Sequence, residues 1–138
     1  MNSELIENPT EEQINRIRKR LQEYNSLFWE TRDKTNYIIQ NAQDGDIKDG
    51  IIFSIFGRWL EIQYLWVREA ERGKGLGRHI LTETENLAKS KGCRKSFLNT
   101  FNFQAKPFYE KNGYKVAYVQ EGYPIKNTRY FLEKDLRD

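Results

Sequence analysis

Cysteine and histidine are almost missing from this chain of 138 residues. Cys93 is the only cysteine and His79 the only histidine. A single thiol cannot form an internal disulfide, and one thiol with one imidazole is too small a set for a structural zinc site. We therefore predict no metal site. The length is sufficient for one domain, residues 1–138, with a single core.

Long apolar runs and a strong excess of one charge are also lacking. No run approaches the length of a membrane span, and the N-terminus MNSELIENPTEEQ is polar and acidic, unlike a signal peptide. A net charge of +3 is too small to indicate a nucleic-acid partner by itself. The basic run Arg16–Arg20 is either a solvated helix face or a patch for a phosphate backbone. We expect a cytoplasmic monomer or homodimer with no membrane or nucleic-acid partner.

Prolines are few and scattered, and no repeat or linker interrupts the chain. Apolar periodicity and turn residues predict helices that start at Thr10, after the glycine-rich turn of residues 73–77, and at Gln104. The predicted strands are residues 4–7, 36–42, 51–56, 59–67, 96–100, 114–120 and 129–133. Asp49-Gly50 is either a turn or a strand start. This order predicts an α/β (α+β) fold with a mixed central sheet of about six to seven strands flanked by about three to four helices.

Glycine is concentrated in the stretch VREAERGKGLGRHIL, residues 67–81, directly before a helical pattern. Its glycines are Gly73, Gly75 and Gly77, and the basic residues among them are Arg72, Lys74 and Arg78. A helix N-terminus offers unpaired N–H groups and partial positive charge, so this turn predicts an anion site. The Walker A pattern is not met, and the third glycine comes one residue early for the dinucleotide fingerprint. A turn that only reverses the chain is the remaining alternative.

Two spacings, one in this stretch and one farther along the chain, carry a resemblance. Arg72, Gly75 and Gly77 fill the pattern Arg/Gln-x-x-Gly-x-Gly/Ala. The stretch NFQAKPFYEKNGY, residues 102–114, fits the pattern Asn-x-x-Ala-x-x-x-Tyr-x-Lys-x-Gly-aromatic. Both patterns, and the order of elements from about residue 59 to 114, resemble the GNAT superfamily of acetyl-CoA-dependent N-acetyltransferases. The resemblance implies a GNAT-like fold over residues 1–138.

The resemblance also implies a reaction. It predicts transfer of the acetyl group of acetyl-CoA to a primary amine, most simply of a small molecule, by direct attack in a ternary complex. A protein lysine or N-terminus as acceptor, and a non-catalytic acyl-CoA-binding or regulatory module, are the alternatives. The residues that it assigns to the cofactor are Leu65, Trp66, Val67, Arg72, Gly73, Lys74, Gly75, Leu76, Gly77, Arg78, Asn102 and Tyr109. In the family a bulge, expected here near residues 65–67, frees a backbone donor for the oxyanion.

Acetyl transfer needs a neutral amine, a stabilised oxyanion and a proton for the departing thiolate. The resemblance assigns the proton to Tyr109, whose phenol is protonated at neutral pH; a role in packing alone is the alternative. Glu61 is the candidate base, because a carboxylate on a packed strand needs a cleft or a partner, and several family members place a catalytic Glu on this strand. A paired Glu61 that only orients its neighbours is the alternative. A covalent route through Cys93, or His79 as base, has no supporting signal.

Two further expectations concern the faces of the strand of residues 59–67, which follow from strand alternation, and the acceptor site, which the resemblance implies. Strand alternation places Tyr64 and Trp66 on the face of Leu60 and Ile62, with Glu61 on the other face. In the family the acceptor is bound by N-terminal helices and the last strands. The residues expected to line its site are Phe28, Trp29, Gln63 and Tyr123, where aromatic rings suit an ammonium group. Ordinary packing is the alternative for each of them.

Overall fold

The computed structural model describes residues 1–137 and divides into two compact units, Met1–Arg32 and Asp33–Asp138. The first unit contains α1 (Glu11–Asn25), which begins with the predicted capping box. The Gln13 N–H donates to the Thr10 hydroxyl at 3.2 Å, and the Thr10 N–H donates to Gln13 Oε1 at 2.9 Å. These bonds satisfy donors that the first helical turn leaves unpaired.

The strand predicted at residues 4–7 is wrong, because these residues form no regular element. Only Leu5 and Ile6 of this segment are apolar, and both are exposed. A strand is stable only when neighbours pair with it, and no strand of the described chain does so here. None of the helices within residues 1–137 is long and apolar enough to cross a membrane.

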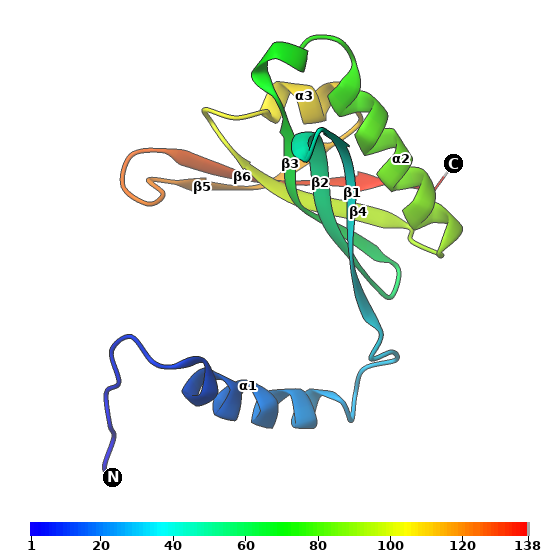
Figure 1. The fold of residues 1–138 in the computed structure, drawn as a ribbon. Coiled ribbons are helices and arrows are strands. Elements are labelled where there is room, and N and C mark those ends of the chain that lie inside the picture. The colour runs from blue at the N-terminus through cyan, green and yellow to red at the C-terminus, as the bar shows by residue number, and fades with distance from the viewer. Residues whose placement is uncertain (138) are drawn as a thin grey trace. The chain divides into compact units, whose positions relative to one another are not determined.

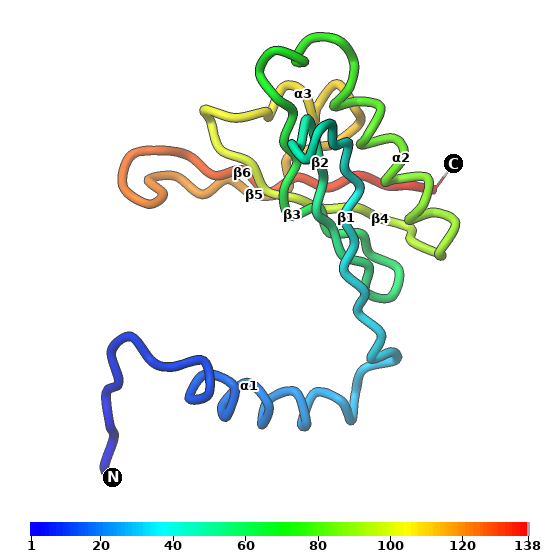
Figure 2. Tube along the Cα trace, viewed as in Figure 1, coloured from blue at the N-terminus to red at the C-terminus, as the bar shows by residue number. Residues whose placement is uncertain are grey.

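The second unit contains a six-stranded mixed sheet in the order β1-β2-β3-β4-β6-β5 (Figures 1 and 2). The strands are β1 (Lys34–Gln43), β2 (Asp46–Phe56), β3 (Trp59–Val67), β4 (Lys95–Phe101), β5 (Lys115–Glu121) and β6 (Thr128–Asp135). Only β3 and β4 pair in parallel. The helices of this unit are α2 (Leu76–Ser90) and α3 (Lys106–Lys111), with a 3₁₀ turn at Glu69–Glu71. The predicted fold class is confirmed, and Asp49-Gly50 lies inside β2.

The core lies between the sheet and α2, which packs on β2 and β3. Ile80, Leu81 and Ala88 of α2 are fully buried, as their helical spacing predicts. They meet a sheet face whose buried residues are Ile51, Phe53, Leu60, Ile62, Leu98 and Leu132. The opposite face has no such cover within this unit. The core therefore fixes which face of β3 and β4 is free for other contacts.

Two irregularities open the middle of the sheet. The parallel pairing of β3 with β4 stops after Glu61 and Phe97. Shortly beyond, Ile62 is the partner of Phe53 and Tyr64 is the partner of Ile52, so Gln63 is an extra residue in a β-bulge. From Ile62 onward, the edge of β3 that would face β4 therefore has no partner strand.

The bulge corrects the predicted alternation along β3. Ile51 and Phe53 share a face of β2, and their partners are Leu65 and Ile62. Leu65 therefore follows Ile62 on the core side, and Tyr64 and Trp66 point to the other side. The expectation that Tyr64 and Trp66 share a face with Leu60 and Ile62 is wrong, because one inserted residue reverses the alternation. The bulge itself was expected near residues 65–67 and lies at Gln63.

A polar network lies buried beneath α2. Glu85 accepts hydrogen bonds from the Tyr114 hydroxyl and the Lys134 ammonium, both at 2.8 Å. Ser96 Oγ lies 2.8 Å from the same Tyr114 oxygen. Burial, and then the negative charge of Glu85, raise the pKa of Tyr114 well above its ordinary value. The network joins α2 to the first half of β4 and to the end of β6.

We expect Glu85→Gln to lower the free energy of unfolding by about 2 kcal/mol, because Lys134 loses its partner and the amide cannot accept both hydrogen bonds. The urea midpoint should fall with an unchanged slope. Glu83→Gln is the control, because Glu83 lies on the exposed side of the same helix. Equal midpoints for the Glu85 variant and the wild type would contradict this role.

Candidate active site

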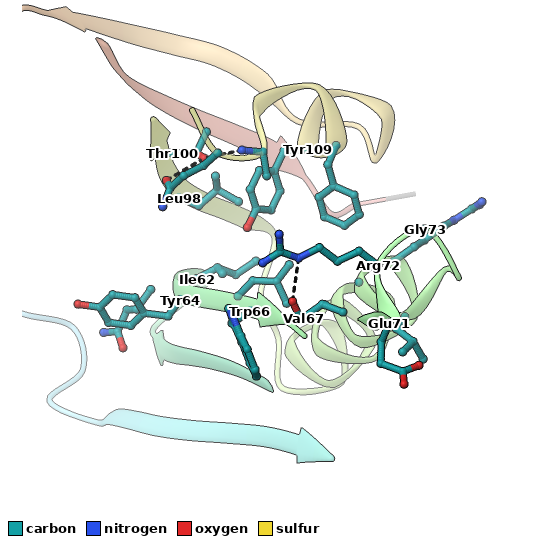
Figure 3. A pocket seen from close by; sticks show the side chains of 18 of the residues that line it. Ile62, Tyr64, Trp66, Val67, Glu71, Arg72, Gly73, Leu98, Thr100 and Tyr109 are labelled. Carbon is teal, nitrogen blue, oxygen red and sulfur yellow. Dashed lines mark hydrogen bonds between the residues drawn. The ribbon is translucent and has the colours of Figure 1, made fainter. Parts of the chain in front are cut away.

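A cleft of about 760 Å³ occupies the opening between β3 and β4 (Figure 3). One wall is β3 from Ile62 to Val67, and the other is β4 from Leu98 to Thr100. The glycine loop and the first turn of α2 lie at one end, and the start of α3 covers the side above β4. The cleft thus joins the two sequence patterns that were singled out above.

The glycine loop leaves the N-terminus of α2 bare. Gly73 and Gly75 have φ angles of 80° and 82°, in the left-handed region that favours glycine. Gly75 is the N-cap of α2, and neither a side-chain cap nor an acidic residue occupies the first turn. A Cβ at Gly73 or Gly75 would meet no atom within 4 Å. The unpaired N–H groups and the helix dipole therefore face open space, as an anion site requires.

Gly77 has a different reason to be glycine. A Cβ there would lie 3.3 Å from Cζ of Phe108 and 3.8 Å from Cγ2 of Val67. The first turn of α2 therefore needs a bare backbone to pack against α3 and β3. Of the flanking residues, Leu76 and Arg78 line the cleft, whereas Lys74 forms an exposed ion pair with Glu71 at 3.4 Å.

Arg72 lies across the cleft instead of staying at the rim. Its Nε donates to the Val67 carbonyl at 2.9 Å. Figure 3 shows the guanidinium between Val67 on β3 and the hydroxyl of Tyr109 above it. The side chain thus ties the glycine loop to the end of β3.

Tyr109 is the buried group that projects into this space. Only 6% of the residue is exposed, and its hydroxyl points into the cleft (Figure 3). Phe108 and Tyr114 pack edge-on against the ring, with centroids at 5.2 and 5.7 Å. Burial raises the pKa of Tyr109 to about 12. The phenol therefore keeps its proton at neutral pH and is a hydrogen-bond donor.

Of the other predicted site residues, some line the cleft and some lie elsewhere. Leu65, Trp66, Val67 and the bulge residue Gln63 line it. Glu61 is half-buried at the last parallel pair, just beyond the lining residues. Phe28 and Trp29 belong to the unit Met1–Arg32. Tyr123 lies in the β5–β6 loop, stacked on Phe101 at 5.7 Å.

Asn102 binds to the protein itself. Its Oδ1 accepts from the Thr128 N–H at 2.9 Å, and its N–H donates to the Thr128 carbonyl at 3.0 Å. Asn102 therefore fixes the start of β6 and is absent from the residues that line the cleft.

Several lining residues had no signal of their own in the sequence. They are Asn99, Thr100, Phe103, Gln104 and Phe108. Thr100 Oγ1 accepts from the Ala105 N–H at 3.3 Å, and Gln104 Oε1 accepts from the Phe101 N–H at 3.0 Å. These bonds hold the turn from β4 into α3. Only the nearby Asn-x-x-Ala pattern pointed to this turn.

The model of the acetyltransferase (GNAT) family matches residues 3–114. The chain belongs to the GNAT acetyltransferase family. The match covers both patterns on which the resemblance was based, and it confirms the fold that they implied. The glycine turn of residues 72–77 lies within this match, at the end of the cleft.

Individual relatives agree with the assignment of the chain to the GNAT family. The GNAT chain is 34% identical to the blasticidin-S acetyltransferase of Streptomyces morookaense over 96 residues, which cover 69% of this chain and 71% of the relative. A crystal structure of an acetyltransferase from Bacillus cereus matches with 33% identity and a TM-score of 0.80, covering 96% of this chain and 97% of that one. The PaiA N-acetyltransferase of Thermoplasma acidophilum, solved with coenzyme A, shares the fold at 21% identity with a TM-score of 0.62, covering 93% of this chain and 80% of that one.

Proposed function

We propose that this GNAT protein transfers the acetyl group of acetyl-CoA to a primary amine of a small molecule, by direct attack in a ternary complex. The observation that carries the proposal is the cleft, which has a bare helix N-terminus at one end and a protonated, buried phenol beside an unpaired strand edge. A small-molecule acceptor is favoured because a relative at 34% identity is a blasticidin-S acetyltransferase.

The residues of the cleft fit coenzyme A chemically. The N–H groups of residues 73–77 and the charge of Arg78 suit a diphosphate. Leu65, Trp66 and Val67 offer a strand edge along which the amides of the pantetheine arm would pair as an added strand. The side-chain NH₂ of Asn102 remains for a further contact with that arm. Arg72 would hold its place at the end of β3 or turn toward the diphosphate. When bound, acetyl-CoA supplies an activated acyl group.

The chain supplies the acid–base chemistry. Glu61 takes the proton of the amine, directly or through water, because only the neutral amine is a nucleophile. A backbone N–H on the unpaired edge of β3 stabilises the carbonyl oxygen as it gains negative charge. The Tyr109 hydroxyl donates a proton to the departing sulfur. Gln63 and Tyr123 are proposed to contact the acceptor.

We expect Glu61→Gln to reduce turnover mainly at lower pH, where the acceptor amine is protonated and needs a base. Above the pKa of the amine the variant should approach the wild-type rate. The measurement is kcat/KM against pH. Glu133→Gln is the control, because Glu133 is exposed on β6 and shares the β4 partner Phe97 with Glu61. The same pH profile for the Glu61 variant and the wild type would remove Glu61 from the mechanism.

The proposed function is tested by thiol release from acetyl-CoA against a panel of small amines and short peptides. Release with small amines supports it. Release with lysine peptides or peptide N-termini alone would show a protein acetyltransferase. Silence across the whole panel, with coenzyme A still binding in calorimetry, would show a non-catalytic acyl-CoA-binding module.

A further inference from the structure

Arg129 of β6 is held rigidly but has few polar partners. Its Nε donates to Asn99 Oδ1 at 3.2 Å. The guanidinium carbon lies 5.0 Å from the ring centroid of Tyr123 and 4.7 Å from that of Phe131. No carboxylate within residues 1–137 forms an ion pair with Arg129. Within the same residues, the bond from Nε to Asn99 is the one hydrogen bond that its side chain makes. The two terminal NH₂ groups of this half-buried cation are therefore unused.

A buried acceptor lies beside it without a partner. Gln120 of β5 is the register neighbour of Arg129. Its Oε1 is buried, and no hydrogen bond reaches it from any described residue. An unsatisfied buried carbonyl is costly, and such groups are commonly completed by a ligand or water. Arg129 and Gln120 thus offer unused donors and an unused acceptor side by side.

Arg129 adjoins the cleft, through Asn99, on the face away from α2. On β4, Leu98 and Thr100 are buried toward the core, so the alternating residues Asn99 and Phe101 project to the other face. Phe101 is the register partner of Arg129 and stacks on Tyr123. Asn99 both lines the cleft and accepts the bond from Arg129. A molecule entering the cleft from this face would therefore pass Arg129.

We propose that Arg129 determines acceptor specificity by binding an oxyanion, a carboxylate or a phosphate, on the same molecule that carries the amine. The inference rests on the proposed function and names the substrate class: amines that also carry an anionic group. Planar NH₂ groups match a carboxylate or phosphate in a bidentate way. The rings of Tyr123 and Phe131 lie 5.0 and 4.7 Å from the guanidinium carbon and help to hold it in place.

The test uses matched amines in the thiol-release assay. 4-(Aminomethyl)benzoate and 4-(aminomethyl)phenylphosphonate are compared with neutral 4-(aminomethyl)benzamide, and 6-aminohexanoate with 6-aminohexanamide. We expect the wild type to prefer the anionic members by at least about 10-fold in kcat/KM, because a polar site rejects an analogue that lacks its partner. The benzoate and phosphonate arms show which oxyanion is bound.

Arg129→Gln should lower kcat/KM about 10–100-fold for the anionic amines and leave the neutral amides unchanged, because only the former lose a charge-assisted pair. Arg129→Lys keeps the charge without the bidentate geometry and should fall in between. Lys126→Gln, in the exposed β5–β6 loop, is the control. Urea midpoints show whether each variant is folded. A purely structural Arg129 would change both classes of amine alike.

Calorimetry with the chain saturated with coenzyme A separates this inference from the proposed function. Benzoate and phenylphosphonate should bind to the wild type more tightly than benzamide, and Arg129→Gln should abolish the difference. Thiol release without any preference for anionic amines overturns the inference and leaves the acetyltransferase intact. Absence of thiol release overturns the proposed function, and the calorimetric preference still decides whether Arg129 binds an oxyanion. Equal binding of benzoate and benzamide overturns the inference in either case.

Discussion

Tyr109→Phe should lower turnover about 10²–10⁴-fold, which corresponds to about 2.7–5.4 kcal/mol of transition-state stabilisation. The substitution removes one oxygen and leaves the ring, so the contacts with Phe108 and Tyr114 remain. The Tyr109 hydroxyl is the group that points into the cleft, and without it the departing thiolate has no donor from this wall. Affinity for coenzyme A should be unchanged, because the substitution leaves intact the glycine loop, where we propose that the diphosphate binds.

The pKa of Tyr109 adds a condition on pH. Since burial raises it to about 12, the phenol is protonated throughout the range in which turnover is measured. The pH profile of the wild type should therefore show no loss of activity from Tyr109 below about pH 10. Tyr118→Phe is the control, because Tyr118 is an exposed tyrosine on β5. Normal turnover of the Tyr109 variant would remove this residue from the mechanism.

Gly75→Val should raise the dissociation constant of coenzyme A about 100-fold or more, a cost of about 2.7 kcal/mol. Gly75 has a φ of 82°, and a left-handed conformation costs a residue with a Cβ about 1–2 kcal/mol. A Cβ here would meet no protein atom within 4 Å, so the new side chain would project into the space where we propose that the diphosphate binds. The expected loss is therefore larger than backbone strain alone produces. Calorimetry with coenzyme A measures it.

Gly45→Val provides a matched control for the strain. Gly45 has a φ of 77° in the β1–β2 turn, and a Cβ there also meets nothing within 4 Å. Both variants should lose similar stability in urea, whereas only the Gly75 variant should lose affinity for coenzyme A. Equal affinity in the two variants would show that the cofactor is bound elsewhere and would overturn the acetyl-transfer proposal.

Local signals predicted most elements of this chain. Thr10 and Gln13 form the expected capping box, and the strand predicted at residues 59–67 coincides with β3. Gly92 and Gly113 have φ angles of 94° and 93° just past α2 and α3, where helices were expected to end. These features depend on residues close together in sequence, so the sequence carries enough information to place them. The segment of residues 4–7 failed because a strand depends on a partner that no local pattern reveals.

Some features of the candidate site were likewise predictable from the sequence, and others were not. The sequence by itself determined the family, the glycine loop and the choice of Tyr109, because a bare turn before a helix and fixed spacings are local properties of the chain. Only the tertiary structure decided that β3 gains a bulge at Gln63, that Asn102 is tied to Thr128, and that Arg129 is bonded to Asn99 of the cleft. The physical reason is that strand register and the burial of a side chain are set by partners distant in sequence.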